Sequence, residues 1–338
     1  MQIDGSVGGG QLLRTALALS LCPPPLGGRG FRMFSVRAAR PRPGLQPQHL
    51  AAVRAAAAVG QAAVTGDVQN STEITFVPRG TRPGSYDFAT GTAGSAVLVL
   101  QTVLPALLVA DAPSRLRIEG GTHNPLAPSF DFLRLAFLPL IERMGPRVSA
   151  RLERPGFYPA GGGEITVDVA PTDRLNPLAL TERGSIVERY AYAWVSHLPR
   201  HIAERELAVV GRALDLPAER LETRVITNAL GPGNVMGVVL RSEYVTEVFT
   251  GFGERGVPAE AVAAGVADAA RRYLAAGVPV GEFLADQLLV PLALARSGRF
   301  VTLRPSRHTT SNAALIERFT ANRIEYRELG ADRYQIEV

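Results

Sequence analysis

One order of secondary-structure elements recurs three times along this chain of 338 residues. Each cycle is predicted to contain a glycine-opened helix, a strand, a polar turn, a second helix and a pair of strands. The middle strands start near Phe34, Leu116 and Thr302, so that 82 residues separate the first two and 186 separate the last two. The extra stretch of roughly 100 residues predicts a segment inserted into the third cycle.

This order predicts an α/β fold built from three repeated α/β units with a smaller inserted α/β domain. We assign residues 1–183 and 278–338 to a large repeat-built catalytic domain and residues 184–277 to the inserted small domain. Residues 186–195 are expected to form the strand that begins the third cycle.

Every basic side chain in the sequence is an arginine, because none of its 36 basic residues is a lysine. A Walker-type phosphate loop, a lysine adenylate and a Schiff base each need a lysine, so these classes are excluded. The single cysteine, Cys22, excludes disulfides and cysteine-rich zinc sites. A covalent nitrogen nucleophile would therefore be one of the five histidines or the N-terminal amine.

His308 is our candidate nucleophile. We expect it in the turn between a strand at 300–303 and the helix that follows, with Thr310 or Ser311 as N-cap. A strand end that faces a helix N-terminus attracts phosphate through its backbone N–H groups. Two arginines add positive charge to this turn, Arg304 and Arg307. The alternative, a loop histidine without a function, is equally compatible with the turn alone.

A second group of polar residues suits phosphate. Residues 8–10 are glycines that open the first helix, and Arg14 follows one turn later. Arg37 and Arg40 crowd the end of a predicted strand at 31–38, where planar guanidinium groups can hold phosphate by paired bonds. The next helix starts with Gln48 and His49. For each arginine the simpler alternative is a solvated surface position.

Charge and hydropathy set broader limits. The net charge of +5 favours a polyanionic partner, although a solvated basic surface is the common alternative. Residues 1–5 lack the pattern of a signal peptide, and the apolar stretch 96–110 is too short and too polar to span a bilayer. We therefore expect a cytoplasmic enzyme without a membrane partner.

The chain resembles RNA 3′-terminal phosphate cyclases in segments that follow one another along almost its whole length. None is decisive alone, but their common register is very specific. The segments are residues 4–14, 37–45, 48–50, 94–95, 100–105, 156–163 and 281–287, with His308. The resemblance implies three α/β units similar to the C-terminal domain of bacterial initiation factor three, with a smaller α/β insertion.

The resemblance also implies a reaction. ATP would convert an RNA 3′-phosphate into a 2′,3′-cyclic phosphate through a covalent adenylate on His308 and an adenylated RNA 3′ end, releasing AMP and pyrophosphate. The implied partners are ATP, a divalent cation (Mg²⁺ or Mn²⁺) and an RNA with a 3′-phosphate, whose neighbouring 2′-OH performs the last step. The oligomeric state, homodimer included, stays open.

By position, the resemblance assigns site residues. Phe283 would offer a ring face to adenine, and Asp286 a carboxylate near the base or ribose. The implied ATP pocket consists of Gln101, Pro128, Phe132, Phe283, Leu284, Ala285, Asp286 and Gln287. The implied phosphate and RNA-end residues are Arg14, Arg37, Arg40, Gln48 and His49.

The metal ligands cannot be assigned from the sequence. Cyclases usually carry a glutamate before the triple glycine, where this chain has a shorter loop and Val7, which cannot bind a hard cation. We therefore expect the cation to be held mainly by ATP oxygens and water. His197 and His201 have a spacing that suits a metal on a helix, but Pro199 between them argues against it.

Two alternative functions remain open. An enolpyruvyl transferase shares the repeated architecture, but such enzymes typically depend on lysines, which this chain lacks. A catalytically inactive relative that binds RNA in ribosome assembly would lack the nucleophilic histidine, so His308 argues against it.

Overall fold

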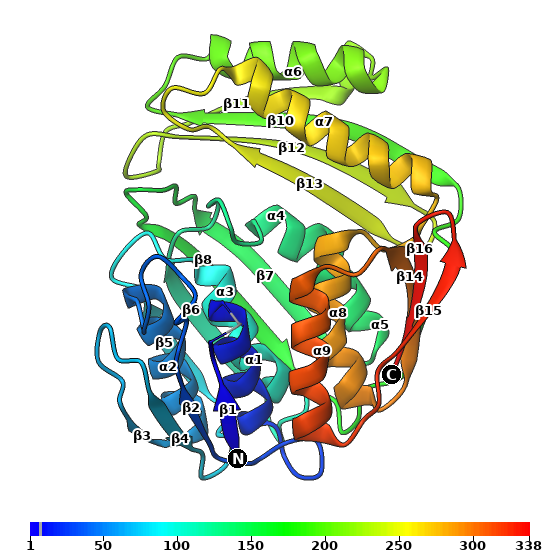
Figure 1. Cartoon of the computed structure of the whole chain (residues 1–338). Helices are drawn as coiled ribbons and strands as arrows, with labels where there is room; N and C mark the ends of the chain where they lie inside the picture. Colours follow the sequence, from blue (N-terminus) through cyan, green and yellow to red (C-terminus); the bar gives the residue numbers. More distant parts are fainter. Residues whose placement is uncertain (7–8) are drawn as a thin grey trace.

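Three of the four sheets share one topology in the computed structural model, which describes residues 1–6 and 9–338 (Figure 1). In each, the first strand pairs parallel with the second, the second antiparallel with the fourth, and the fourth antiparallel with the third. The three sheets have the orders β1-β2-β4-β3, β5-β6-β8-β7 and β9-β14-β16-β15. The predicted α/β fold with a threefold repeat is confirmed.

The first unit follows the predicted order, but its second strand is shorter than expected. The predicted strand 31–38 ends at Phe34, because Ser35 and Arg37 take left-handed backbone angles that turn the chain. The elements are β1 (Gln2–Asp4), α1 (Gly10–Leu21), β2 (Phe31–Phe34), α2 (Pro47–Gly60), β3 (Ala63–Thr65) and β4 (Ile74–Val77).

The second unit contains a strand that the sequence did not reveal, β5, and a helix that is less regular than predicted. The predicted second helix of this unit is interrupted by a π-helical turn at Leu133–Phe137. The elements are β5 (Ser85–Ala89), α3 (Ala96–Leu107), β6 (Ser114–Gly120), α4 (Phe130–Phe132), the π turn, α5 (Leu138–Arg143), β7 (Arg147–Arg154) and β8 (Gly163–Ala170).

The third unit begins with β9, so the assignment of residues 186–195 to this position is wrong. Residues 186–196 form β10, which belongs to a separate sheet, whereas β9 pairs with β14. The elements are β9 (Leu178–Leu180), α8 (Glu282–Ala295), β14 (Gly298–Leu303), α9 (Arg307–Thr320), β15 (Glu325–Gly330) and β16 (Arg333–Glu337).

The fourth sheet, here called the inserted sheet, lies between β9 and α8 in the sequence and has the order β11-β10-β12-β13. Figure 1 shows it above the three repeat units, with α6 and α7 on its outer face. Its elements are β10 (Ile186–Ser196), α6 (His201–Leu214), a 3₁₀ turn (Ala218–Arg220), β11 (Leu221–Ile226), β12 (Gly233–Ser242), β13 (Thr246–Phe252) and α7 (Ala259–Ala276). We propose that residues 184–277 are a separate small domain.

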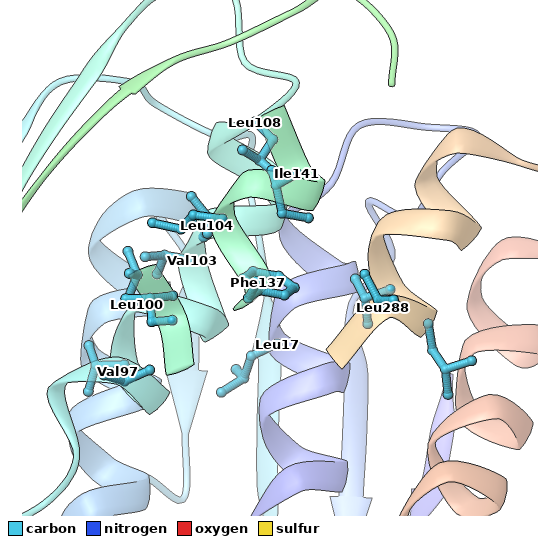
Figure 2. Close-up of a cluster of buried hydrophobic side chains, with 14 of the residues drawn as sticks. Leu17, Val97, Leu100, Val103, Leu104, Leu108, Phe137, Ile141 and Leu288 are labelled. Atoms are coloured by element: carbon cyan, nitrogen blue, oxygen red, sulfur yellow. The ribbon is translucent and has the colours of Figure 1, made fainter. Parts of the chain in front are cut away.

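The core of the repeat units lies between their helices. Figure 2 shows Leu17 of α1, Leu100 of α3, Phe137 of the π turn and Leu288 of α8 in one buried cluster. Fully burying such a side chain stabilises the fold by about 1.5–3 kcal/mol. This packing fixes the relative positions of α1, α3, α8 and α9, whose first turns carry the candidate site.

The two faces of the inserted sheet pack against different partners: one face against α6 and α7, the other against the repeat units. Along β10, Ala191, Ala193 and Val195 join the cluster formed with α6 and α7. The alternate residues Tyr192 and Trp194 join the core of the repeat units. This period of two is the expected signature of a strand buried on both faces.

None of the helices within the described residues combines the length and the apolar character that a membrane crossing requires.

Candidate active site

His308 lies in the first turn of α9 rather than in the turn before it. The N-cap is Ser306, whose hydroxyl accepts a hydrogen bond from the Thr309 amide at 3.1 Å, so the prediction of Thr310 or Ser311 as N-cap is wrong. The imidazole is exposed at the helix N-terminus. Arg304 points to another partner, because its Nε lies 3.1 Å from Asp332 Oδ1. It therefore adds little to the charge beside His308.

A hydrogen-bond chain fixes the imidazole of His308. Its Nδ1 lies 2.8 Å from Gln11 Oε1, and Gln11 Nε2 donates to Asp286 Oδ2 at 2.5 Å. An ionised carboxylate only accepts, so the amide nitrogen of Gln11 faces Asp286 and its oxygen faces His308. His308 must then donate from Nδ1, so in the neutral imidazole the lone pair of Nε2 is free to attack.

The helices that carry Gln11, Asp286 and His308 are α1, α8 and α9, and a second set of hydrogen bonds also joins them. Thr15 of α1 donates to Asn312 Oδ1 of α9 at 2.6 Å, and Asn312 Nδ2 lies 3.5 Å from the Asp286 backbone oxygen of α8. Gln11, Thr15 and Asn312 were not among the predicted site residues. Gln11 lies within the segment 4–14 that carries the resemblance, whereas Thr15 and Asn312 were indicated only as polar residues in predicted helices.

The start of α1 gathers predicted phosphate residues. A side chain at Gly10 would overlap the His49 ring and come within 2.8 Å of an Arg14 nitrogen, so the close packing there requires glycine. A Cβ at Gly9 would lie 3.1 Å from an Arg40 nitrogen. Burial lowers the pKa of Arg14 to about 10, although nearby Asp286 opposes the shift. Arginine therefore stays charged at neutral pH.

His49 is a buried neutral histidine. Its Nδ1 accepts from the Gln46 amide at 3.0 Å and closes a capping box at the start of α2. Burial, with added repulsion from Arg14 and Arg37, lowers the pKa of His49 to about 3. The imidazole can therefore accept or donate a hydrogen bond here, but it does not carry positive charge at neutral pH.

We predict that His49 makes the fold less stable in acid. In the unfolded chain its pKa is about 6.5, so below that pH the unfolded state binds a proton that the folded state excludes. The free energy of unfolding should fall by up to about 1.4 kcal/mol per pH unit from this source. His49→Gln keeps the capping acceptor without titrating, so urea unfolding at pH 7 and pH 5 should show a smaller loss for the variant. Equal losses would contradict the buried neutral imidazole.

Arg37 has a structural role that the sequence did not reveal. Its guanidinium Nη1 donates to the backbone oxygens of Arg42 at 2.7 Å and Gly44 at 2.8 Å. The side chain thereby closes the loop that carries Arg40. Burial and the neighbouring Arg40 lower its pKa. Gln48 lies elsewhere, beside Gly94 at the opening of α3.

The residues of the implied ATP pocket differ in accessibility. The ring of Phe283 is 71 % exposed, whereas Phe132 is only 4 % exposed, and Leu284 and Ala285 face the core. Two polar atoms of this set, Gln101 Nε2 and Asp286 Oδ1, are buried without a hydrogen-bond partner in the described part of the chain. Buried polar atoms are normally paired, so this pattern is typical of a site that receives a polar ligand. Pro128 and Gln287 are partly buried.

The described residues do not provide a protein-built metal site. Residues 1–6 and 9–338 contain no group of three or more His, Cys, Asp or Glu side chains placed to hold a metal ion. Beside His308, Asp286 supplies one carboxylate, and that group already accepts from Gln11. Val7 and Gly8, on which the expected departure from the glutamate-containing loop depends, lie outside the described residues.

Comparison with known proteins identifies the family. A family profile described as RNA 3′-terminal phosphate cyclase matches residues 6–326. The chain belongs to the RNA 3′-terminal phosphate cyclase family. It is 49 % identical over 337 residues to the RNA 3′-terminal phosphate cyclase of Pseudomonas fluorescens, covering 100 % of this chain and 97 % of that protein. It is 50 % identical over 322 residues to the one of Ralstonia nicotianae, covering 94 % and 91 %. Membership confirms the prediction of an enzyme.

A solved structure, the enolpyruvyl transferase NikO from Streptomyces tendae, aligns with 99 % of this cyclase-family chain and 48 % of its own. The sequence identity is 11 % and the TM-score 0.37, so this likeness supports no inference about activity. Membership of the cyclase family therefore rests on the sequence relatives.

Proposed function

We propose that this protein converts RNA 3′-terminal phosphates into 2′,3′-cyclic phosphates, with ATP as the energy source and His308 as the residue that carries AMP. The single observation that supports this best is the chain from Asp286 through Gln11 to His308. In the neutral imidazole this chain selects the tautomer with a free lone pair on Nε2, at an exposed helix N-terminus, and that lone pair is what a nitrogen nucleophile requires.

The proposed reaction has three balanced steps. In the first, Nε2 of His308 forms a bond to the α-phosphorus of ATP while the bond to the β-phosphate breaks and pyrophosphate leaves. In the second, an oxygen of the RNA 3′-phosphate attacks the AMP phosphorus and the N–P bond breaks. In the third, the 2′-OH attacks the 3′-phosphorus, AMP leaves, and the proton of the hydroxyl passes to solvent or a base.

The residues at the start of α1 suit the phosphate groups in these steps. Arg14 and Arg40 lie against Gly10 and Gly9, where the first N–H groups of the helix face outward. Guanidinium groups beside such amides stabilise the charge that develops in phosphoryl transfer. We propose that ATP binds as a complex with Mg²⁺ or Mn²⁺, whose charge offsets that of the phosphates. The described residues contain no group of three or more His, Cys, Asp or Glu side chains that could hold this cation.

The adenine is proposed to lie at the start of α8. Phe283 exposes a large ring face there, and the buried, unpaired Oδ1 of Asp286 is available to a polar group of the nucleotide. Burial raises the pKa of Asp286, while Gln11, His308 and Arg14 oppose the shift. A carboxylate in such surroundings is typical of a functional site.

The two alternative functions are less well supported. A binding protein of ribosome assembly has no use for an imidazole held by two further helices in one tautomer. An enolpyruvyl transferase would not need a nucleophilic histidine either. Incubation with α-labelled ATP separates these functions from the cyclase. The purified protein should retain label in an acid-labile, base-stable bond, as a histidine phosphoramidate does, and an unlabelled protein would contradict the proposal.

Arg40 and Arg37 are predicted to respond differently to lysine. Arg40→Lys keeps the charge beside Gly9 but loses the planar fork, so cyclisation should slow by about 10-fold with little change in melting temperature. Arg37→Lys also breaks two bonds of the loop, so both cyclisation and melting temperature should fall. Rates and melting curves of the two variants test this. A wild-type rate of cyclisation in Arg40→Lys would show that Arg40 does not bind phosphate.

A further inference from the structure

The two sides of the proposed nucleotide pocket each contact the inserted sheet through a buried polar side chain. One side is the segment that carries Pro128 and Phe132 and includes α4. The other is the start of α8, with Phe283 and Asp286. The contacts with the inserted sheet come from β10 and β13.

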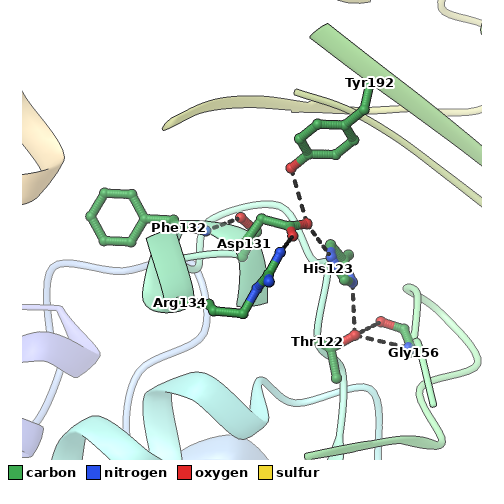
Figure 3. Close-up of polar contacts among 8 residues, drawn as sticks. Thr122, His123, Asp131, Phe132, Arg134, Gly156 and Tyr192 are labelled. Carbon is green, nitrogen blue, oxygen red and sulfur yellow. Dashed lines mark hydrogen bonds and ion pairs between the residues drawn. The ribbon is translucent and has the colours of Figure 1, made fainter. Parts of the chain in front are cut away.

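The first contact joins β10 to α4. Tyr192 donates from its hydroxyl to Asp131 Oδ2 at 3.0 Å, and His123 Nε2 lies 3.1 Å from the same oxygen (Figure 3). All three side chains are buried. Burial alone would raise the pKa of Asp131, but the bonds from His123 and Tyr192, with Arg134 nearby, hold it below its ordinary value. A buried carboxylate with this many donors is firmly held.

This contact reaches the pocket through the next residue. Asp131 and Phe132 are neighbours on α4, and Figure 3 shows the Phe132 ring on the opposite side of that helix from Tyr192. Thr122 holds the His123 ring from its other nitrogen, because the Thr122 hydroxyl lies 2.8 Å from His123 Nδ1 and accepts from the Gly156 amide at 2.9 Å. A shift of Tyr192 would therefore move the pocket side of α4.

The second contact joins β13 to α8. Glu247 is 2 % exposed, and its Oε1 accepts from the Gly281 amide at 2.5 Å. Gly281 is the N-cap of α8, two residues before Phe283. A Cβ at Gly281 would lie 3.0–3.3 Å from the Glu247 carboxyl group, so the fit leaves little room for another side chain. The β13 carboxyl group thus fixes where α8 begins.

We propose that the inserted sheet positions both sides of the nucleotide pocket, with Tyr192 holding α4 through Asp131 and Glu247 holding the start of α8. The proposal rests on the proposed function for the location of the nucleotide. It makes Tyr192 and Glu247 positioning residues, since neither touches the reacting atoms. It also gives the inserted segment a role in the first, RNA-independent step of the reaction.

The inserted sheet offers a matched control. Glu206 on α6 is also a buried carboxyl group, and it accepts from Asn234 Nδ2 at 2.8 Å within the same sheet-and-helix layer. Burial raises the pKa of Glu206 to about 7 and that of Glu247 to about 8. Glu206 contacts neither α4 nor α8 through this bond, so its replacement tests general loss of stability alone.

The test measures adenylylation of the full chain at a series of α-labelled ATP concentrations. Tyr192→Phe and Glu247→Ala should each raise the half-saturating ATP concentration by about 5- to 10-fold, the effect of one lost hydrogen bond, with little change in maximal rate. Glu247→Gln keeps the acceptor and should restore the wild-type value at pH 7. Glu206→Ala, the matched truncation of a buried carboxyl group, should keep the wild-type half-saturating concentration.

Unchanged half-saturation in both Tyr192→Phe and Glu247→Ala, or an equal rise in Glu206→Ala, would overturn the proposal. A wild-type protein that takes no label would instead overturn the proposed function. In that case hydrogen exchange of the nucleotide-free protein still tests the contact. The amides at the start of α8 should exchange faster in Glu247→Ala than in Glu206→Ala, and equal protection would contradict the role of Glu247.

Discussion

Replacing His308 with alanine is expected to abolish the covalent labelling of the protein by α-labelled ATP. The variant removes the only imidazole that the described structure places at the start of α9, hydrogen bonded to Gln11. Because the side chain is exposed, its truncation should change the free energy of unfolding by less than about 0.5 kcal/mol. Loss of label would therefore report the loss of the nucleophile rather than unfolding.

Two other histidines provide controls for this variant. His201 is exposed at the start of α6, and His197 is also exposed, with its Nε2 3.1 Å from the Ala229 oxygen. His201→Ala and His197→Ala should both keep the label. His123 is a poorer control, because it belongs to the buried network with Asp131. Label that persists in His308→Ala at the wild-type level would show that another atom accepts AMP.

Replacing Gln11 with leucine is expected to slow adenylylation by about 100-fold or more, the usual effect of losing the group that fixes a catalytic tautomer. Leucine is similar in size but has no acceptor for Nδ1 of His308. The imidazole would then populate the tautomer with a proton on Nε2, whose nitrogen cannot attack. Single-turnover labelling with saturating ATP measures the rate directly.

Asp286→Asn tests the same chain from its other end. An asparagine can donate as well as accept, so the Gln11 amide is no longer forced to turn its oxygen towards His308. At saturating ATP, where a lost contact with the nucleotide does not limit the rate, the double variant Gln11→Leu with Asp286→Asn should be hardly slower than Gln11→Leu alone, because the three residues act as one unit. Fully additive losses at saturating ATP would show that Asp286 does not act through Gln11.

The sequence predicted the elements whose signals are local. The strand pair and the glycine-opened helix of each unit follow from local patterns, and the structure contains them. The short strands β5 and β9 were missed or misplaced, because β9 has only three residues and pairs with β14, far away in the sequence. Such strands are specified by tertiary context rather than by their own pattern.

The candidate site shows the same division. His308 was chosen as the candidate nucleophile because few residue types were available for a nitrogen nucleophile. Its place in α9 was predicted incorrectly because several hydroxyl residues compete for the N-cap, and the earliest, Ser306, takes it. The link from Gln11 to His308 spans 297 residues, so no local pattern indicates it. Arg37 was correctly placed near Arg40, but its bonds to the loop backbone depend on a left-handed turn that the sequence did not reveal.

The most direct test of the proposed function follows the RNA end. An RNA with a labelled 3′-terminal phosphate is incubated with this protein and ATP, then treated with phosphatase. We expect the label to become phosphatase-resistant, with one AMP released per end, and an RNA that carries a 2′-deoxy terminal sugar to stop at the adenylated end. If the protein is adenylated on His308 but the RNA label stays fully sensitive to phosphatase, this result would contradict cyclisation as the function.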